Sequence, residues 1–362
     1  MKVAFITRST LYTVPGGDSQ QVLQTANMLK ALQADVDIIL ANEKIDYEKY
    51  DLLHFFNIIR PADILIHIKR SNKPFIVSTI LIDYSVYDKQ YRKGISGRLF
   101  SLLPAGGIEY LKTLYRWLSK RDSLVSVSYL WKGQRRSIKE ILSKANCIIV
   151  QAEEEYSDLV KLYNIHSPFV IIKNGVDITL FKPDASIARN NNLVLCVARI
   201  EGIKNQVNLI KALNNSSYKL ILIGNAAPNQ KNYYDQCKKI AGENISFITH
   251  LPQQQLVNYY AAAKVHVLPS WFEVCGLSSL EAAAMGCKLV ITDNGYARSY
   301  FGDNAFYCNA SQPESILKAI DVAMTVNDTD NFQKNILHNY TWQKTAEQTL
   351  AVYKKYIEQC SH

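Results

Sequence analysis

The sequence predicts an α/β fold of two domains, each built on a parallel sheet with helices around it. Three observations support this prediction. The chain has 362 residues, about twice the length of one typical domain. Short apolar runs alternate with helix-length segments along most of the chain, which is typical of βαβ units. Apolar residues make up 48% and charged residues 20% of the composition, the balance of an ordinary globular protein.

The first domain is predicted over residues 1–175. It opens with an apolar strand at Val3–Ile6, and the loop Pro15–Gly17 leads into a helix. Asp18 and Gln21 have the spacing of a capping box, which marks the start of that helix. The apolar positions that follow fall on one helical face: Val22, Leu23, Ala26 and Leu29. Further strands of the same sheet are predicted at Val36–Leu40, Leu52–Phe56, Phe75–Ile80 and Cys147–Val150.

The second domain is predicted over residues 178–340. Asn174–Asp177 is a turn signal and the polar run Arg189–Asn192 lacks periodicity, so the interdomain linker is expected there. Beyond it the alternation resumes, with strands predicted at Leu193–Val197, Lys219–Ile223, Ile245–Ile248, Val265–Leu268 and Lys288–Thr292. Residues 341–362 contain a last helix, Thr341–Tyr356, which we expect to pack back on the first domain.

Charge and cysteine content narrow the class of protein. The seven cysteines are scattered without a Cys-x-x-Cys pair, which predicts reduced thiols rather than disulfides or zinc. No apolar stretch is long enough for a signal peptide or a membrane span, so a cytoplasmic location is expected. The net charge of +9 comes from residues 84–144, where thirteen basic residues face four acidic ones. We expect this segment to form a basic helical insertion in the first domain.

The sharpest chemical signal is the segment 269–282, which runs from a strand end through a glycine-containing loop into a helix. Glu273 lies in the loop, at the carboxyl edge of the predicted sheet where open α/β folds bind ligands. Glu281 lies about one turn inside the helix. Carboxylates at these two places can accept hydrogen bonds from sugar or ribose hydroxyls, and the helix N-terminus near Gly276 offers unpaired N–H groups to a phosphate.

Two further signals concern phosphate. Arg199 and Lys204 follow another predicted strand and can converge on a diphosphate leaving group, which needs cations when no metal is bound. Gly16 and Gly17 follow the first strand, where the missing side chains let main-chain amides approach a phosphate. Either signal alone is also compatible with surface charge or an ordinary turn.

Taken in order, these segments resemble the retaining glycosyltransferases of family 4, which have the GT-B fold of two facing Rossmann-like domains with a C-terminal crossover helix. The resemblance covers essentially the whole chain and includes the closing Tyr340–Trp342 segment. It is carried by Gly16–Gly17, Asn174–Asp177, Arg199 with Lys204, and above all 273–286.

The resemblance implies roles for individual residues. Glu273 would hold the donor sugar, Glu281 the ribose hydroxyls, and Gly17 a phosphate from the first domain. Arg199 and Lys204 would bind the diphosphate. Main-chain amides would come from Val274, Cys275, Gly276 and Leu277. Sugar transfer from a nucleotide-sugar would then need neither a metal nor a cofactor. The alternatives are a nucleotide-sugar epimerase of the same fold and a non-catalytic nucleotide-sugar-binding module.

The chain departs from the family at one place. The family often carries His-Asp at the end of the fourth strand of the first domain, whereas Leu81-Ile82-Asp83 stands here. Ile82 cannot hydrogen-bond, so the departure implies either a different donor sugar or a role for Asp83 as the sugar or acceptor contact. The pair Asp35 and Asp37 matches a metal-binding Asp-x-Asp pattern but opens an apolar strand, so no metal site is expected there. No histidine has metal-ligand spacing.

The basic segment 84–144 predicts a surface helix. Its apolar positions recur at helical spacing: Leu111, Leu114, Tyr115 and Leu118. A basic stripe accompanies them, formed by Lys112, Arg116 and Lys120, and aromatic residues lie near it at Trp117, Tyr129 and Trp131. Such a helix can lie on anionic lipid and admit a lipid-linked glycan acceptor, as in assembly of bacterial surface polysaccharide or lipopolysaccharide. The alternatives are packing on its own domain and nucleic-acid binding, for which no motif is present.

Overall fold

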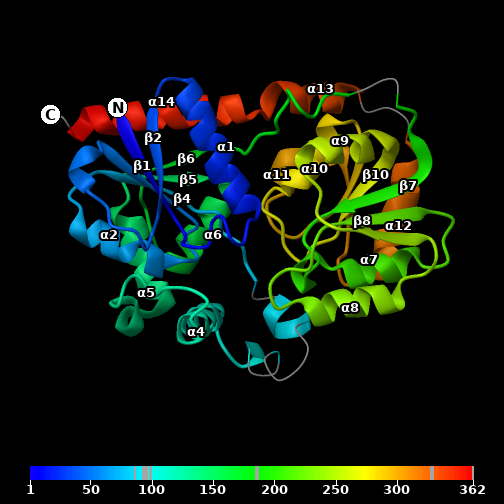
Figure 1. The fold of residues 1–362 in the computed structure, drawn as a ribbon, viewed down its shortest axis with the longest axis horizontal. Coiled ribbons are helices and arrows are strands. Elements are labelled where there is room, and N and C mark those ends of the chain that lie inside the picture. The colour runs from blue at the N-terminus through cyan, green and yellow to red at the C-terminus, as the bar shows by residue number, and fades with distance from the viewer. Residues whose placement is uncertain (85–86, 92–96, 98–99, 184–186, 327–329, 361–362) are drawn as a thin grey trace. The chain divides into compact units, whose positions relative to one another are not determined.

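The computed structural model describes residues 1–84, 87–91, 97, 100–183, 187–326 and 330–360 (Figure 1). The chain divides into two compact units. The first unit contains Met1–Lys89, Lys93–Asn174 and Trp342–His362, and the second contains Gln90–Arg92 and Gly175–Thr341. The C-terminal residues therefore belong with the N-terminal part of the chain.

The first unit is built on a six-stranded parallel sheet with the order β2-β1-β3-β4-β5-β6. Its strands are β1 (Lys2–Thr7), β2 (Asp35–Leu40), β3 (Leu52–Phe56), β4 (Phe75–Ser78), β5 (Cys147–Val150) and β6 (Phe169–Ile171). The central strands β3, β4 and β5 are buried along their whole length. Burial on both faces explains why they are mostly apolar rather than alternating, with His54 and Ser78 as their polar residues.

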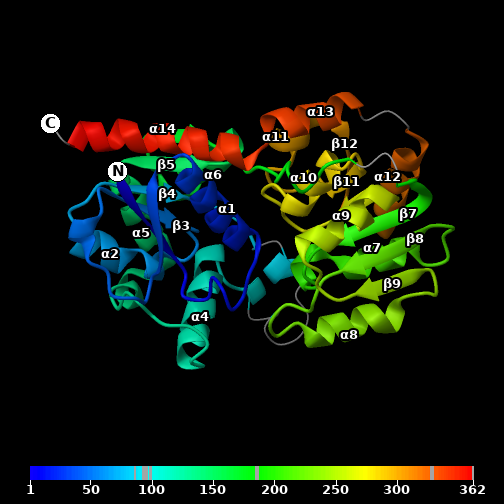
Figure 2. The same cartoon turned by 45° about the horizontal axis from the view of Figure 1, so that its top comes forward.

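Helices surround the sheet of the first unit (Figure 2). They are α1 (Gly17–Ala31), α2 (Leu65–Arg70), α4 (Ala105–Leu118), α5 (Tyr129–Lys144), α6 (Glu153–Tyr163) and α14 (Trp342–Cys360). Helix α4 packs on α5. Helix α14 packs against α1 and places Ala346 and Tyr353 in the core of this unit. The Tyr353 hydroxyl also bonds Nδ1 of buried His54 in β3 at 2.5 Å. These contacts fix the last helix on the first unit.

The second unit repeats the architecture with the strand order β12-β11-β10-β7-β8-β9, again all parallel. Its strands are β7 (Asn190–Val197), β8 (Lys219–Ile223), β9 (Ile245–Ile248), β10 (Ala263–Leu268), β11 (Lys288–Thr292) and β12 (Ala305–Cys308). Its helices are α7 (Gln206–Leu213), α8 (Lys231–Ile240), α9 (Gln253–Ala262), α10 (Leu277–Ala284), α11 (Arg298–Phe301), α12 (Pro313–Thr325) and α13 (Asp330–Asn339). One apolar core joins the sheet to these helices.

Two Rossmann-like sheets confirm the predicted α/β fold class, and every predicted strand is present. Two local predictions were wrong. Asn190–Asn192, expected in a linker, forms the start of β7. Asp18 does not cap α1, because the helix begins at Gly17 and the Asp18 carboxylate accepts hydrogen bonds from Arg8 instead, at 2.7 and 3.0 Å. Strands β6 and β12 were not predicted.

Candidate functional site

Glu273 lies in the loop that joins β10 to α10 in the second unit. The loop is tied to its neighbours by main-chain bonds, from Trp271 N to Ile203 O at 2.9 Å and from Glu273 N to Asn294 O at 3.1 Å. The Asn205 side chain adds a bond to Pro269 O at 3.0 Å. Glu273 is 7% exposed. The fold therefore holds this carboxylate at the carboxyl edge of the sheet, where ligands of open α/β sheets bind.

Lys204 and Glu273 are 69 residues apart in sequence but form an ion pair. The Lys204 ammonium donates to Oε1 of Glu273, and the buried Ser270 hydroxyl donates to the same oxygen at 2.6 Å. Lys204 ends a short 3-10 helix, Gly202–Lys204, directly before α7. The structure thus brings together two of the residues that the sequence singled out, and adds Ser270 to them.

Arg199 lies close in sequence to Lys204 but pairs with a different carboxylate. Its guanidinium is 2.9 Å from Oε1 of Glu201, and its side chain is 41% exposed. The carbonyl oxygen of Arg199 accepts a bond from Gln206 Nε2 at 2.9 Å, which fixes the loop but leaves the side chain near solvent. No bond joins Arg199 to the Lys204–Glu273 pair in the part of the chain that the structure describes.

Helix α10 begins at Leu277, four residues after Glu273. Gly276 precedes it with φ at +69°, in the left-handed region that favours glycine, and Cβ there would lie 3.0 Å from Leu268 Cδ2. Val274 and Cys275 are buried, whereas Gly276 and Leu277 are half-buried. The first N–H groups of a helix lack intrahelical partners, so this end of α10 presents donors beside the Glu273 loop.

Glu281 lies inside α10 and is bound by two side chains of α9. Tyr260 Oη donates to Oε2 at 2.9 Å and Gln253 Nε2 donates to Oε1 at 2.8 Å. Burial raises the pKa of Glu281 to about 7 despite these two bonds. Glu281 therefore titrates near neutral pH, and Tyr260 and Gln253 are partners that its position in the sequence did not indicate.

The first unit places Gly16 and Gly17 at the start of α1. Gly16 has extended backbone, and its N–H donates to Ser19 Oγ at 3.2 Å, while Gly17 is exposed. Next to them, Arg8 is 8% exposed and binds Asp18. The Arg8 guanidinium helps hold the pKa of Asp18 below its usual range. The charge of Asp18 is thus paired beside the glycine loop.

Asp83 follows β4 and is exposed. Three residues earlier the main chain has an unusual conformation, with φ of Ile80 at +47°. Glu155, which is fully buried at the start of α6, accepts bonds from Thr79 Oγ1 at 2.5 Å and Leu81 N at 2.9 Å. Positive φ is rare for a β-branched residue such as Ile80. The Glu155 carboxylate binds the residues on both sides of Ile80 and thereby holds this main-chain conformation.

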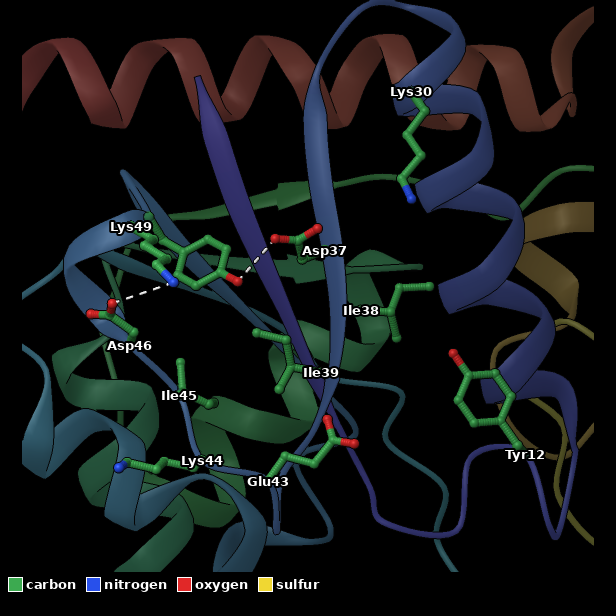
Figure 3. Close-up of a pocket in the computed structure, with 11 residues that line it drawn as sticks. Tyr12, Lys30, Asp37, Ile38, Ile39, Glu43, Lys44, Ile45, Asp46 and Lys49 are labelled. Carbon is green, nitrogen blue, oxygen red and sulfur yellow. Dashed lines mark hydrogen bonds and ion pairs between the residues drawn. The ribbon is translucent and has the colours of Figure 1, made fainter.

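An open pocket of about 570 Å³ lies beside the edge strand β2, but no candidate residue lines it (Figure 3). Both basic and acidic side chains line this pocket. Asp37, one of the acidic ones, accepts a hydrogen bond from Tyr50 Oη at 2.9 Å. Lys2 pairs with both Asp35 and Asp37, at 3.1 and 3.2 Å. Within the described residues no three or more His, Cys, Asp or Glu side chains gather as a metal site.

The basic segment forms α4 and α5, but its predicted basic stripe does not form. Lys112 donates to the buried Asp88 and, at 2.8 Å, to Glu109, and Arg116 bonds Thr113 at 3.1 Å. Lys120 lies beyond the end of α4. Tyr129, expected at a lipid surface, is fully buried. Arg92, Lys93 and Arg98 lie outside the described residues.

The predicted apolar face of α4 is largely exposed. Leu111 is 37%, Tyr115 58% and Leu118 72% exposed, and Trp117 is 40% exposed on the same helix. Leu114 is half-buried. Lys120 and Arg121 follow the helix in exposed positions. None of the described helices is long and apolar enough to span a membrane.

Residues 177–338 match the family model described as "Glycosyl transferases group 1". A D-inositol 3-phosphate glycosyltransferase of Corynebacterium urealyticum is 22% identical over 66% of this chain and 66% of its own length. A second protein of that name, from Nocardia farcinica, is 23% identical over 59% of this chain and 54% of its own length. The match thus spans just under two thirds of the length of the first relative and about half of the length of the second.

A longer match is the N-acetylgalactosamine-N,N'-diacetylbacillosaminyl-diphospho-undecaprenol 4-alpha-N-acetylgalactosaminyltransferase of Campylobacter jejuni, 25% identical over 82% of this chain and 83% of its own. Among solved structures, a sucrose-phosphate synthase from Thermosynechococcus elongatus has a TM-score of 0.77 at 16% identity, covering 99% of this chain and 100% of that one. Anabaena HepE in complex with UDP-glucose has a TM-score of 0.72 at 16% identity, covering 98% and 100%. These likenesses support the two-domain fold.

Proposed function

We propose that this chain, whose residues 177–338 match the family model of the group 1 glycosyl transferases, transfers a sugar from a nucleotide-sugar donor to a glycan acceptor with retention of configuration and without a metal. The observation that carries the proposal is the Lys204–Glu273 pair at the carboxyl edge of the second sheet. It sets a hydrogen-bond acceptor and a cation side by side where the sequence resemblance expects a sugar and a diphosphate. The hydroxyl of the buried Ser270 holds the Glu273 carboxylate in place.

In the proposed reaction the acceptor hydroxyl attacks the anomeric carbon on the face that the nucleotide leaves. The bond from the anomeric carbon to the phosphate oxygen breaks, the bond to the acceptor oxygen forms, and the hydroxyl proton passes to the departing phosphate. Lys204 and Arg199 stabilise the charge that develops on the leaving diphosphate. The N-terminal amides of α10 contribute to the same end.

Glu273 and Glu281 recognise the two ends of the donor in this scheme. Lys204 and Ser270 both bind Oε1 of Glu273, and no described residue bonds Oε2. We assign Oε2 to a sugar hydroxyl. Glu281, already bound by Tyr260 and Gln253, would exchange a bond for the ribose hydroxyls of the nucleotide. Gly17 and Asp83 are the proposed contributions of the first unit, to phosphate and to sugar or acceptor.

A donor panel tests the proposal and separates it from its alternatives. The protein is incubated with UDP-, GDP- and ADP-sugars, starting with UDP-glucose, and with a diphospho-undecaprenol-linked glycan as acceptor. The proposal expects release of the nucleoside diphosphate and an increase in the mass of the acceptor by one sugar residue. An epimerase leaves the donor mass unchanged and converts its sugar, and a binding module leaves donor and acceptor unchanged. Either of these results contradicts the proposal.

We further propose that the acceptor is lipid-linked and that α4 docks the protein on the cytoplasmic face of a membrane, in assembly of a surface polysaccharide. The support is the exposed apolar set on α4, Leu111, Tyr115, Trp117 and Leu118. Amphipathic surface helices bury such a face at the headgroup level. Lys112 and Arg116 are bound within the unit. Lys120 and Arg121 are exposed just beyond α4, with the Arg121 guanidinium 5.5 Å from the centroid of the Tyr115 ring, and these two residues would supply the charge for anionic lipid.

Co-sedimentation with vesicles at low salt tests this docking. We expect binding to vesicles with anionic lipid and weak binding to neutral ones. Leu111→Ser with Leu118→Ser should abolish it, and Lys120→Glu with Arg121→Glu should weaken it. The matched control is Lys144→Glu, an exposed lysine at the end of α5. Absence of binding to anionic vesicles, or equal loss in the control, contradicts the docking.

A further inference from the structure

The main chain of Glu273 is held from behind by the loop that follows β11. Glu273 and Gly295 form an isolated parallel bridge, in which Glu273 N donates to Asn294 O at 3.1 Å and Tyr296 N donates to Glu273 O at 2.8 Å. The ring of Tyr296 also packs edge-on against Phe272, with centroids 5.3 Å apart. The carbonyl and amide of Glu273 are therefore both fixed by one short segment, 294–296.

Gly295 lies where no other residue fits without displacing Glu273. Its φ is +105°, and a Cβ built there would lie 2.1 Å from the carbonyl oxygen of Glu273 and 2.9 Å from its nitrogen. Real Cβ contacts are longer by more than 1 Å, and the obstacle is main chain rather than a flexible side chain. A side chain at position 295 must push the Glu273 peptide away from the sheet edge.

The side chain of Glu273 is held separately. Ser270 is fully buried, and its hydroxyl donates to Oε1 of Glu273 at 2.6 Å. Lys204 bonds the same oxygen, which orients the carboxylate so that Oε2 is the oxygen without a bond to a described residue. Ser270 and Gly295 thus act on the carboxylate and on the main chain of one residue.

We propose that Gly295 and Ser270 are positioning residues for Glu273, which fix the oxygen Oε2 for a donor-sugar hydroxyl. The inference rests on the proposed function, because Glu273 is the residue assigned to the sugar. It makes a specific demand: losing either residue weakens recognition of the sugar more than recognition of the nucleoside, since Glu281, the residue assigned to the ribose, is held by α9 and not by the segment 294–296. Neither residue touches the reacting atoms.

Gly295→Ala is compared with Gly302→Ala. Gly302 also has positive φ, at +49°, but nothing lies within 4 Å of a Cβ placed there. Both substitutions impose backbone strain, and only the first meets Glu273. A misplacement of about 1 Å can cost about 100-fold in rate. We expect Gly295→Ala to lower kcat/KM by about 100-fold, and Gly302→Ala to change it less than about threefold after correction for the folded fraction.

The Kd values for UDP and UDP-glucose, measured by calorimetry, distinguish positioning from general damage. Gly295→Ala should weaken the binding of UDP-glucose by a clearly larger factor than the binding of UDP. Ser270→Ala should behave alike with a smaller effect, and Ser270→Cys should restore part of it. Ser137→Ala is the control, since Ser137 is a fully buried serine of α5 whose hydroxyl has no hydrogen-bond partner among the described residues.

The two hypotheses fail in different ways. If no donor of the panel is bound or turned over by the wild type, the proposed function is wrong. If the wild type is active and Gly295→Ala retains its activity, or loses UDP and UDP-glucose binding in equal proportion, the positioning role is wrong. A crystal structure of Gly295→Ala in which Glu273 keeps its place overturns the inference whatever the activity.

Discussion

We predict that Glu281, if it binds the ribose as proposed, makes donor binding depend on pH. Burial raises its pKa from the ordinary value of 4.5 to about 7, although Tyr260 and Gln253 both donate to it. Ribose hydroxyls that donate to this carboxylate favour its ionised form. Donor binding must then release the proton that Glu281 holds below neutral pH. We predict that donor affinity rises as the pH increases from 6 to 8.

The expected magnitude follows from the pKa. With a pKa of about 7, roughly a tenth of Glu281 is ionised at pH 6 and roughly nine tenths at pH 8. If only the ionised form accepts the ribose, Kd falls about tenfold across this range, equivalent to about 1.4 kcal/mol. Stability changes in the opposite sense: because the folded pKa is raised, the stability that Glu281 contributes below pH 4.5 is lost as the pH rises through about 7.

Calorimetry with UDP-glucose at pH 6, 7 and 8 measures the effect. The intact donor is used because the terminal phosphate of free UDP has a pKa of about 6, and its own titration would add to that of Glu281. Glu281→Gln keeps the shape of the side chain and removes its titration, so it should bind more weakly and with a Kd that does not depend on pH. A pH-independent wild-type Kd, or the same pH dependence in Glu281→Gln, refutes the assignment of Glu281 to the ribose.

Three other predictions address the second unit. Glu273→Gln and Lys204→Ala should each lower kcat/KM by at least about 2–3 kcal/mol, the scale of one preorganised contact, with unchanged thermal unfolding; near-wild-type transfer by either removes its assigned role. EDTA should leave transfer intact, and a strict requirement for manganese or magnesium contradicts the metal-free scheme. His266→Leu should raise the free energy of unfolding in urea by about 1–3 kcal/mol, because His266 is fully buried in β10 with neither ring nitrogen bonded to a described residue; a decrease would mean that its ring packing outweighs the unmet hydrogen bonds.

Strand positions were predictable because a strand buried on both faces must be an apolar run, and such runs are legible in one dimension. Strands β6 and β12 were missed because Phe169–Ile171 and Ala305–Cys308 are short and only partly buried. Asn190–Asn192 was not predicted as strand because these three asparagines are exposed and polar, although they extend β7 beyond its buried part. In both cases tertiary pairing, not local pattern, decides the secondary structure.

The candidate site was predictable at the level of residues but not of contacts. Glu273 and Lys204 were each identified from their own segments, while their ion pair spans 69 residues and depends on how β7 and β10 pair in the sheet. Gly295 carries no sequence signal of its own, because its importance is the approach of another main chain. Lys112 was misassigned to a free basic stripe, since its partner Asp88 lies 24 residues earlier in the same segment, in the short helix Tyr87–Tyr91, and only the fold brings the two together.

Proton NMR of the transfer reaction tests the central claim most directly. The wild-type protein is mixed with an α-linked UDP-sugar that it turns over and with its acceptor, and the anomeric signal of the first product is followed before any spontaneous change. Retaining transfer predicts an α-linked product that appears in step with released UDP, at a rate that Glu273→Gln lowers. A β-linked product, or release of UDP with free sugar and no glycosidic product, would contradict the account.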